Sequence, residues 1–156
     1  MYIVSACLLG ANCKYNGGNN DNEAVKDFCE GHKVLAVCPE TEGGLKSPRP
    51  PAEQIRCPSD EGCGSNADSC VIRVVNKNGE DLTEYFRRGA EICLKKVLDS
   101  GEQPEVAILK ANSPSCGCGK IYDGTFTGTL TDGDGIFAAL LKEHGIKVIT
   151  EIVVNK

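Results

Sequence analysis

Three cysteines of this sequence follow short apolar runs that are typical of β-strands. Cys7 comes after IVSA, Cys38 comes after VLAV, and Cys116 follows the run EVAILK within KANSPSCGCG. Thiolate sulfur is a preferred protein ligand of zinc and of iron–sulfur clusters. Because ligands bind outside the carboxyl ends of parallel strands, we expect these thiols to converge on one metal centre with a coordination position left open. Unrelated buried thiols are the alternative, since free cysteine is often buried.

Two carboxylates follow Cys38 in the segment VCPETEGGLKSPRPPAEQI. Glu40 or Glu42, close to a metal, has the chemistry of a general acid or base. Solvated loop charges are the alternative for both. The glycines and prolines of this segment predict a tightly built loop.

The same segment predicts a short helix at residues 52–55. Pro50 or Pro51 suits its first turn, because proline lacks the backbone N–H group that is unpaired at that position. The free amides of that turn, together with Arg49, would bind an anionic group.

Hydroxyl groups accompany the third cysteine in the motif NSPSCGCG. Ser113 and Ser115 precede Cys116, and the glycines permit the backbone to fold closely around a cofactor. Lys110 comes just before the motif and would neutralise a negative cluster or a phosphate. A solvated lysine at a strand end is the alternative.

The elements that position these residues alternate between strands and helices. Short β-branched runs predict strands, and longer stretches with apolar residues at helical spacing predict helices. Such alternation indicates an α/β fold, here a single Rossmann-like three-layer domain over residues 1–156 with a mainly parallel sheet. The predicted strands are 1–7, 33–38, 69–75, 105–110 and 146–154, and the predicted helices are 21–31, 81–100 and 132–144.

Composition narrows the class of protein. The chain has 156 residues, a net charge of -5 and ten cysteines. Without a secretory signal or an apolar run long enough to span a membrane, we expect a cytoplasmic protein with reduced thiols. The acidic charge argues against an extended nucleic-acid surface and favours a small-molecule ligand.

Three motifs carry a resemblance to a known family. SACLLG followed by CKYNGG, VCPETEGGLKSPRPPAE and LKANSPSCG occur in this order. They closely resemble the domain-of-unknown-function 523 family (DUF523), whose characterised members are thiouracil desulfurases that carry a [4Fe-4S] cluster. The resemblance covers the chain from Val4 to the segment GIFAALLKEHGIKVI.

The resemblance implies a function and roles for individual residues. It implies a [4Fe-4S] cluster held by Cys7, Cys38 and Cys116, with one open iron. It also implies Glu42 and Ser113 as catalytic residues, with Glu40 and Ser115 as the alternatives. The implied reaction converts a 2- or 4-thiouracil-type base or nucleotide into the oxo form and releases hydrosulfide without net redox change.

The remaining cysteines lie outside this triad. Cys93 falls on the apolar stripe of the predicted helix 81–100 and is expected in the core, and Cys29 carries no signal. Cys13 follows Cys7 in a turn and is the candidate for a substitute ligand. Cys118 is close enough in sequence to Cys116 to compete with it for iron. Residues 57–70 hold three further cysteines in a polar segment that we expect to be a loop over the pocket, with a zinc site as the alternative. These are Cys57, Cys63 and Cys70.

A different class of function also fits a cysteine-rich chain. A non-catalytic protein of zinc or iron–sulfur traffic would use the thiols alone. It would leave Glu42 and Ser113 without a role, which favours the enzyme. A regulator that binds a small molecule on the same fold would bind thiouracil without releasing hydrosulfide.

Overall fold

The centre of the molecule is a parallel sheet of four strands in the order β2-β1-β5-β8. These strands are β1 (Tyr2–Ser5), β2 (Val34–Val37), β5 (Val106–Leu109) and β8 (Val148–Thr150) in the computed structural model, which describes residues 1–56 and 72–155. β1 and β5 lie in the middle of the sheet and are buried throughout. Parallel pairing brings the carboxyl ends of neighbouring strands to one edge, which is the edge that the predicted site requires.

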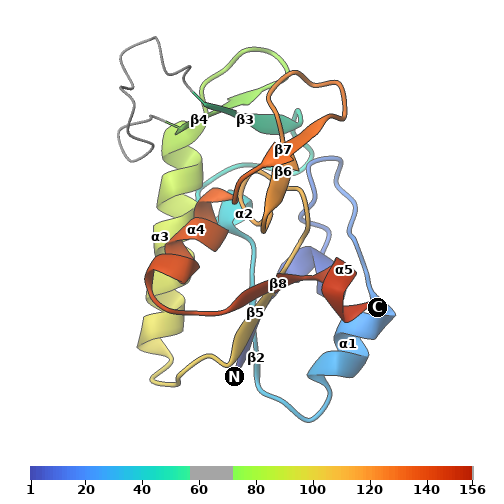
Figure 1. Ribbon diagram of the computed structural model, residues 1–156, viewed down its shortest axis with the longest axis vertical. Helices are drawn as coiled ribbons and strands as arrows, with labels where there is room; N and C mark the ends of the chain where they lie inside the picture. The colour runs from blue at the N-terminus through green and yellow to red at the C-terminus, as the bar shows by residue number, and fades with distance from the viewer. Residues whose placement is uncertain (57–71, 156) are drawn as a thin grey trace.

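Helices cover both faces of this sheet (Figure 1). α3 (Thr83–Asp99) and α4 (Ile136–Glu143) pack on one face through a core that contains Phe137 and Leu141. α1 (Glu23–Cys29) and α5 (Glu151–Val154) cover the other face. The three-layer α/β fold with a mainly parallel sheet is therefore confirmed.

Two small antiparallel sheets lie beyond the carboxyl ends of the main strands (Figure 1). β3 (Ala52–Arg56) pairs with β4 (Ile72–Asn76), and β6 (Lys120–Tyr122) pairs with β7 (Leu130–Asp132). A 3-10 helix, η1 (Ala6–Leu9), follows β1, and the one-turn helix α2 (Pro39–Glu42) follows β2. These short elements build the walls of the site.

Several predicted elements differ from the structure. The helix predicted at residues 52–55 is wrong, because these residues form β3 and pair with the distant β4. The strand predicted at 69–75 begins only at Ile72 among the described residues and belongs to a small antiparallel sheet. The strand predicted at 146–154 ends at Thr150, where α5 begins. Glu151 explains that change of direction, because its carboxylate accepts the Ala111 N–H and must turn inward to reach it.

The other predictions agree with the structure within a few residues. α1 begins after Asn22, whose side chain accepts the Val25 N–H, and α3 ends before Gly101 at a φ of 71°. α4 begins four residues later than predicted, at Ile136, and ends before Gly145. The predicted loop at 57–70, with its cysteines, lies outside the described residues.

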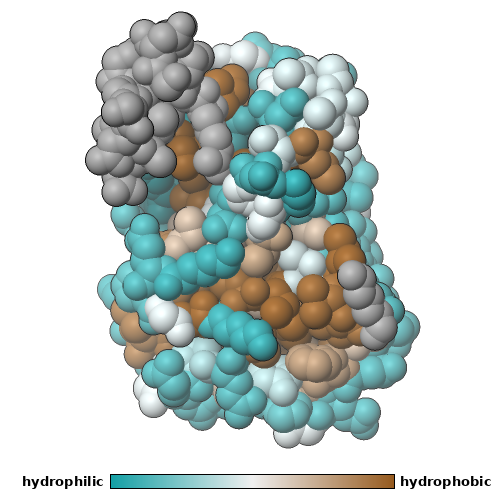
Figure 2. All heavy atoms as spheres, viewed as in Figure 1, coloured by the Kyte–Doolittle hydropathy of each residue, from teal (hydrophilic) through white to brown (hydrophobic). Residues whose placement is uncertain are grey.

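One face of the molecule exposes apolar side chains. Figure 2 shows them gathered over the edge strand β8 and beside α5, where Ile152 and Val153 are exposed. None of the described helices is long and apolar enough to cross a membrane.

α2 packs against α3 by direct backbone contact. A Cβ atom placed on Gly89 would lie 1.7 Å from the Pro39 carbonyl oxygen, and one placed on Gly43 would lie 2.0 Å from the Tyr85 carbonyl oxygen. No side chain fits between the two helices at these points. This contact fixes the position of α2, which follows Cys38, against α3.

We expect the Gly89→Ala variant to be less stable than the parent by about 3 kcal/mol, because the added methyl group must force α2 away from α3. In an unobstructed helix the same change would stabilise by about 1 kcal/mol. Urea unfolding measures the difference. The control is Glu91→Ala, an exposed position on the same helix, which should stay within about 0.5 kcal/mol of the parent. Equal stability of the two variants would contradict the backbone contact.

Candidate functional site

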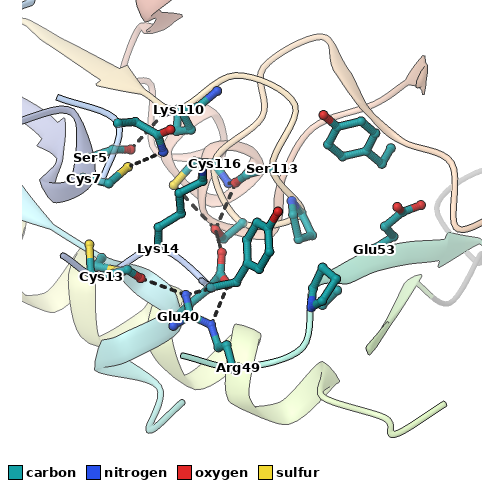
Figure 3. Close-up of a pocket in the computed structure, with 18 of the residues that line it drawn as sticks. Ser5, Cys7, Cys13, Lys14, Glu40, Arg49, Glu53, Lys110, Ser113 and Cys116 are labelled. Atoms are coloured by element: carbon teal, nitrogen blue, oxygen red, sulfur yellow. Dashed lines mark hydrogen bonds and ion pairs between the residues drawn. The ribbon is translucent and has the colours of Figure 1, made fainter. Parts of the chain in front are cut away.

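A cavity of about 480 Å³ opens at the carboxyl ends of β1, β2 and β5 (Figure 3). The three cysteines predicted at strand ends line it, namely Cys7, Cys38 and Cys116. A fourth cysteine, Cys13, lines it as well. The structure thus brings the predicted triad to one cavity and adds a sulfur atom to it. That the triad binds a metal stays a prediction.

Each thiol is held by a short element that follows a strand. Cys7 lies in η1, where its carbonyl oxygen accepts the Asn20 N–H at 2.9 Å and its sulfur accepts the Asn20 side-chain amide at 3.4 Å. Cys38 is the residue before α2, and its carbonyl oxygen accepts the Glu42 N–H. The N–H of Cys116 donates to the Ser113 hydroxyl oxygen at 2.8 Å. The thiols are therefore positioned by backbone contacts that the sequence spacing alone does not show.

Three of the thiols influence one another's protonation. The neighbouring Cys38 and Cys7 thiols raise the pKa of Cys13. Cys13 in turn lowers the pKa of Cys7 and, with help from Thr41, lowers the pKa of Cys38 to about 6. Cys7 and Cys38 are therefore the sulfur atoms that most readily carry the negative charge of a metal ligand.

Cys116 differs from the other thiols because it is deeply buried. Burial raises the pKa of its thiol to about 12, although the neighbouring Ser5 and Ser115 side chains act in the opposite direction. A metal ion would reverse this preference, since a coordinated thiol loses its proton. Cys116 lies in the cavity wall within reach of the charge on Cys7.

The donor set fits an iron–sulfur cluster. Four soft sulfur donors from separate segments of the chain line a single cavity, and such a cluster binds each cysteine through a different iron. Among residues 1–56 and 72–155, no three His, Cys, Asp or Glu side chains surround one point closely enough to bind a single metal ion. Three of the thiols could thus hold a cluster, and the fourth thiol would not be needed as a ligand.

A chain of hydrogen bonds leads from the serine motif to a carboxylate. The Ser115 hydroxyl donates to Glu40 Oε2 at 2.8 Å, and the Ser113 and Ser115 hydroxyl oxygens are 3.2 Å apart. Because Ser115 gives its proton to Glu40, Ser113 must be the donor in the second contact. The order Ser113, Ser115, Glu40 is therefore a path along which a proton can move from the cavity to a carboxylate.

Arg49 holds the other oxygen of this carboxylate. Its Nε and Nη2 atoms donate to Glu40 Oε1 at 3.3 and 3.1 Å, and Nη2 also donates to the Cys13 carbonyl oxygen at 3.0 Å. The Arg49 side chain is 8% exposed, so its charge is engaged and not displayed to solvent. The predicted anion site at Arg49 therefore lacks both the helix and the free cation that it required.

Glu42 lies elsewhere. Its carboxylate pairs with Lys96 Nζ on α3 at 2.6 Å, and it does not line the cavity. Of the two carboxylates in this motif, the structure brings only Glu40 to the thiols and the serines. The general acid or base predicted for Glu42 is better matched by Glu40, which the sequence offered as the alternative.

Lys110 does line the cavity, but its ammonium group already has a partner. Lys110 Nζ lies 2.9 Å from Glu151 Oε2 and donates to the Ala111 carbonyl oxygen. It also helps to lower the pKa of the Cys7 thiol through its charge. It thus stabilises a negative charge on sulfur while it is paired with Glu151.

The other described cysteines do not line this cavity. Cys93, on α3, is fully buried in the core, as predicted, and Cys29, the last residue of α1, is buried as well. The Cys118 thiol donates to the Val148 carbonyl oxygen at 3.5 Å and packs against the core, so it does not compete with Cys116 here. Cys57, Cys63 and Cys70 lie outside the described residues.

We expect Arg49→Met to destabilise the protein by about 3 kcal/mol, because it leaves the largely buried Glu40 carboxylate without its counter-ion. The double variant Arg49→Met with Glu40→Gln should recover part of that loss, since the unpaired charge is gone. Urea unfolding of the parent, both single variants and the double variant measures the coupling. Strictly additive losses would contradict the ion pair.

A family model and two known proteins are similar to nearly the whole of this chain. Residues 2–152 match the family described as 2-thiouracil desulfurase. The YbbK protein of Bacillus subtilis (strain 168), described as uncharacterized, is 40% identical over 155 residues, which is 99% of this chain and 98% of that protein. A solved structure described as the [4Fe-4S]-dependent thiouracil desulfidase TudS is 42% identical with a TM-score of 0.77, and the match covers 97% of this chain and 90% of that one.

The family match spans nearly the whole chain and includes every element that lines the cavity. Of the residues that the sequence resemblance implied, Cys7, Cys38, Cys116 and Ser113 line the cavity, whereas Glu42 does not and Glu40 takes its place. This chain belongs to the 2-thiouracil desulfurase family.

Proposed function

We propose that this chain is a [4Fe-4S]-dependent thiouracil desulfidase that converts a thiolated pyrimidine into its oxo form and releases hydrosulfide. The observation that carries the proposal is the cavity itself, where cysteines suited to a cluster face a Ser–Ser–Glu chain of hydrogen bonds. The family match and the described activity of the solved relative support it. A protein of metal storage would have no use for the serine and carboxylate chain.

The cluster would be held by Cys7, Cys38 and Cys116, with Cys13 as the alternative third ligand. When bound, a cluster with one iron free of protein ligands supplies a soft Lewis acid for the thiocarbonyl sulfur. The lowered pKa values of Cys7 and Cys38 suit both of them to ligation. Lys110 would offset the negative charge that the thiolates bring to the cavity.

Glu40 is the proposed general base. Arg49 fixes its Oε1 atom, so the carboxylate keeps its orientation while Oε2 accepts a proton. A water molecule that attacks the thiocarbonyl carbon must lose a proton, and Glu40 receives it directly or through Ser113 and Ser115. The same chain returns a proton to the leaving sulfur. Water and thiocarbonyl give carbonyl and hydrogen sulfide, so no electrons are gained or lost.

The cavity volume of about 480 Å³ lies in the range of small-molecule sites. The family match supports a 2- or 4-thiouracil-type base or its nucleotide as the substrate. We propose that the enzyme is a single domain. We place it in the cytoplasm, where cysteine thiols stay reduced and remain available to bind a cluster.

We expect Glu40→Gln to lower kcat for 2-thiouracil by about 100-fold or more, because the amide cannot accept the proton. The iron content per chain should not change, since Glu40 is not a proposed ligand. Glu42→Gln is the matched control two residues away, and it should keep near-parental kcat. If Glu42→Gln loses activity and Glu40→Gln keeps it, the assignment of the general base is wrong.

Iron and acid-labile sulfide per chain, measured on protein purified without oxygen, identify the ligands. Loss of the cluster is expected in Cys7→Ser, Cys38→Ser and Cys116→Ser, because a serine oxygen is a poor ligand for this iron. Cys118→Ser serves as the control and should load fully. A cluster that persists in Cys116→Ser and disappears in Cys13→Ser would replace Cys116 with Cys13 in the triad.

A further inference from the structure

Phe126 has an unusual backbone conformation. Its φ is 59°, and only Asn112 shares a positive φ among the described residues other than glycine. Asparagine tolerates this region, but a bulky aromatic residue seldom adopts it. A strained residue persists only where its surroundings hold it, and such residues concentrate at ligand sites. We therefore expect that a neighbouring group holds the backbone of Phe126 and that the residue has a role at the cavity.

Glu53 on β3 holds this backbone. Its side chain is 8% exposed, and its Oε1 atom accepts the Gly124 N–H at 2.9 Å and the Phe126 N–H at 3.2 Å. The tip of the β6–β7 hairpin also lies directly on β3, since a Cβ atom on Gly124 would lie 2.8 Å from the Gln54 carbonyl oxygen. One buried carboxylate thus fixes the hairpin tip and the direction of the Phe126 side chain.

Phe126 is part of the cavity wall and belongs to neither apolar cluster of the described core. It lines the cavity together with Tyr122 and Glu53. Glu53 lies across the cavity from Cys7 and Cys13 (Figure 3). Phe126 is therefore placed by Glu53 and not by core packing.

We propose that Phe126 is a specificity-determining residue whose ring stacks on the face of the pyrimidine, and that Glu53 is the positioning residue that aims it. This inference rests on the proposed function. Phe126 is bound to Glu53, which lies across the cavity from Cys7 and Cys13, so a heteroaromatic base that directs its thiocarbonyl toward these thiols extends its ring toward Phe126. An aromatic side chain gives such a base a stacking partner that tolerates different ring substituents.

The variant Phe126→Gly separates this role from a structural one. Glycine adopts a positive φ freely, so the variant should unfold at the same or a higher urea concentration than the parent. Loss of the ring should raise KM for 2-thiouracil by about fivefold or more, while kcat changes less. Iron content should equal that of the parent. Equilibrium dialysis with uracil, the product, gives a second measure of binding that does not depend on turnover.

Variants of Glu53 test its role as a positioning residue. Glu53→Gln keeps an oxygen that accepts both N–H groups and should retain a KM near that of the parent. Glu53→Leu removes the acceptor and should raise KM in the manner of Phe126→Gly. Leu130→Ala, which removes an exposed side chain from the same hairpin outside the cavity wall, is the control and should not change KM.

The outcomes are distinct. If the parent is active and Phe126→Gly has the same KM and the same affinity for uracil as the parent, the inference is overturned. The proposed function is then left intact. Marked loss of stability in Phe126→Gly with unchanged KM would likewise assign the ring a structural role. A cluster-loaded parent that neither binds nor desulfurates 2-thiouracil overturns the proposed function and this inference with it.

Discussion

The Glu40 carboxylate is the interaction on which the site depends. Its two oxygens face different segments, because Arg49 binds one and Ser115 binds the other. Arg49 also binds the Cys13 carbonyl oxygen, so the segment after β1, the segment after β2 and the loop after β5 meet at one charge. A largely buried carboxylate is stable only if both oxygens are satisfied. The requirement to satisfy Glu40 therefore draws the thiols and the serines into the same cavity.

Arg49 and Lys110 are both paired before any substrate arrives. Arg49 is paired with Glu40, and Lys110 is paired with Glu151. Both cations fix groups that donate or accept protons, so they serve orientation and proton transfer more than electrostatic capture. Lys14 and Lys77 also line the cavity. A heterocycle in such a cavity is recognised by its shape, by stacking and by hydrogen bonds.

The sequence predicted the convergence of Cys7, Cys38 and Cys116 because parallel strands must end at one edge. It did not distinguish Glu40 from Glu42, because that choice depends on α2, a single turn that places the two side chains roughly 200° apart. The prolines before residues 52–55 fit a helix start as well as an edge strand, and only the distant β4 decides between them. The turn after Cys7 did indicate Cys13 as a further sulfur near the triad, whereas the strained Phe126 arises from tertiary contacts that no local pattern encodes.

The first turn of α4 has no side-chain cap, and the serine and cysteine loop supplies the missing partners. The Ile136 and Phe137 N–H groups donate to the Pro114 and Ser115 carbonyl oxygens, and a Cβ atom on Gly135 would lie 2.4 Å from the Cys116 backbone nitrogen. The loop is therefore part of a helix terminus and cannot move without breaking that helix. A change in the backbone of either segment must therefore be matched in the other, so the chemistry of this loop is tied to a helix that does not line the cavity.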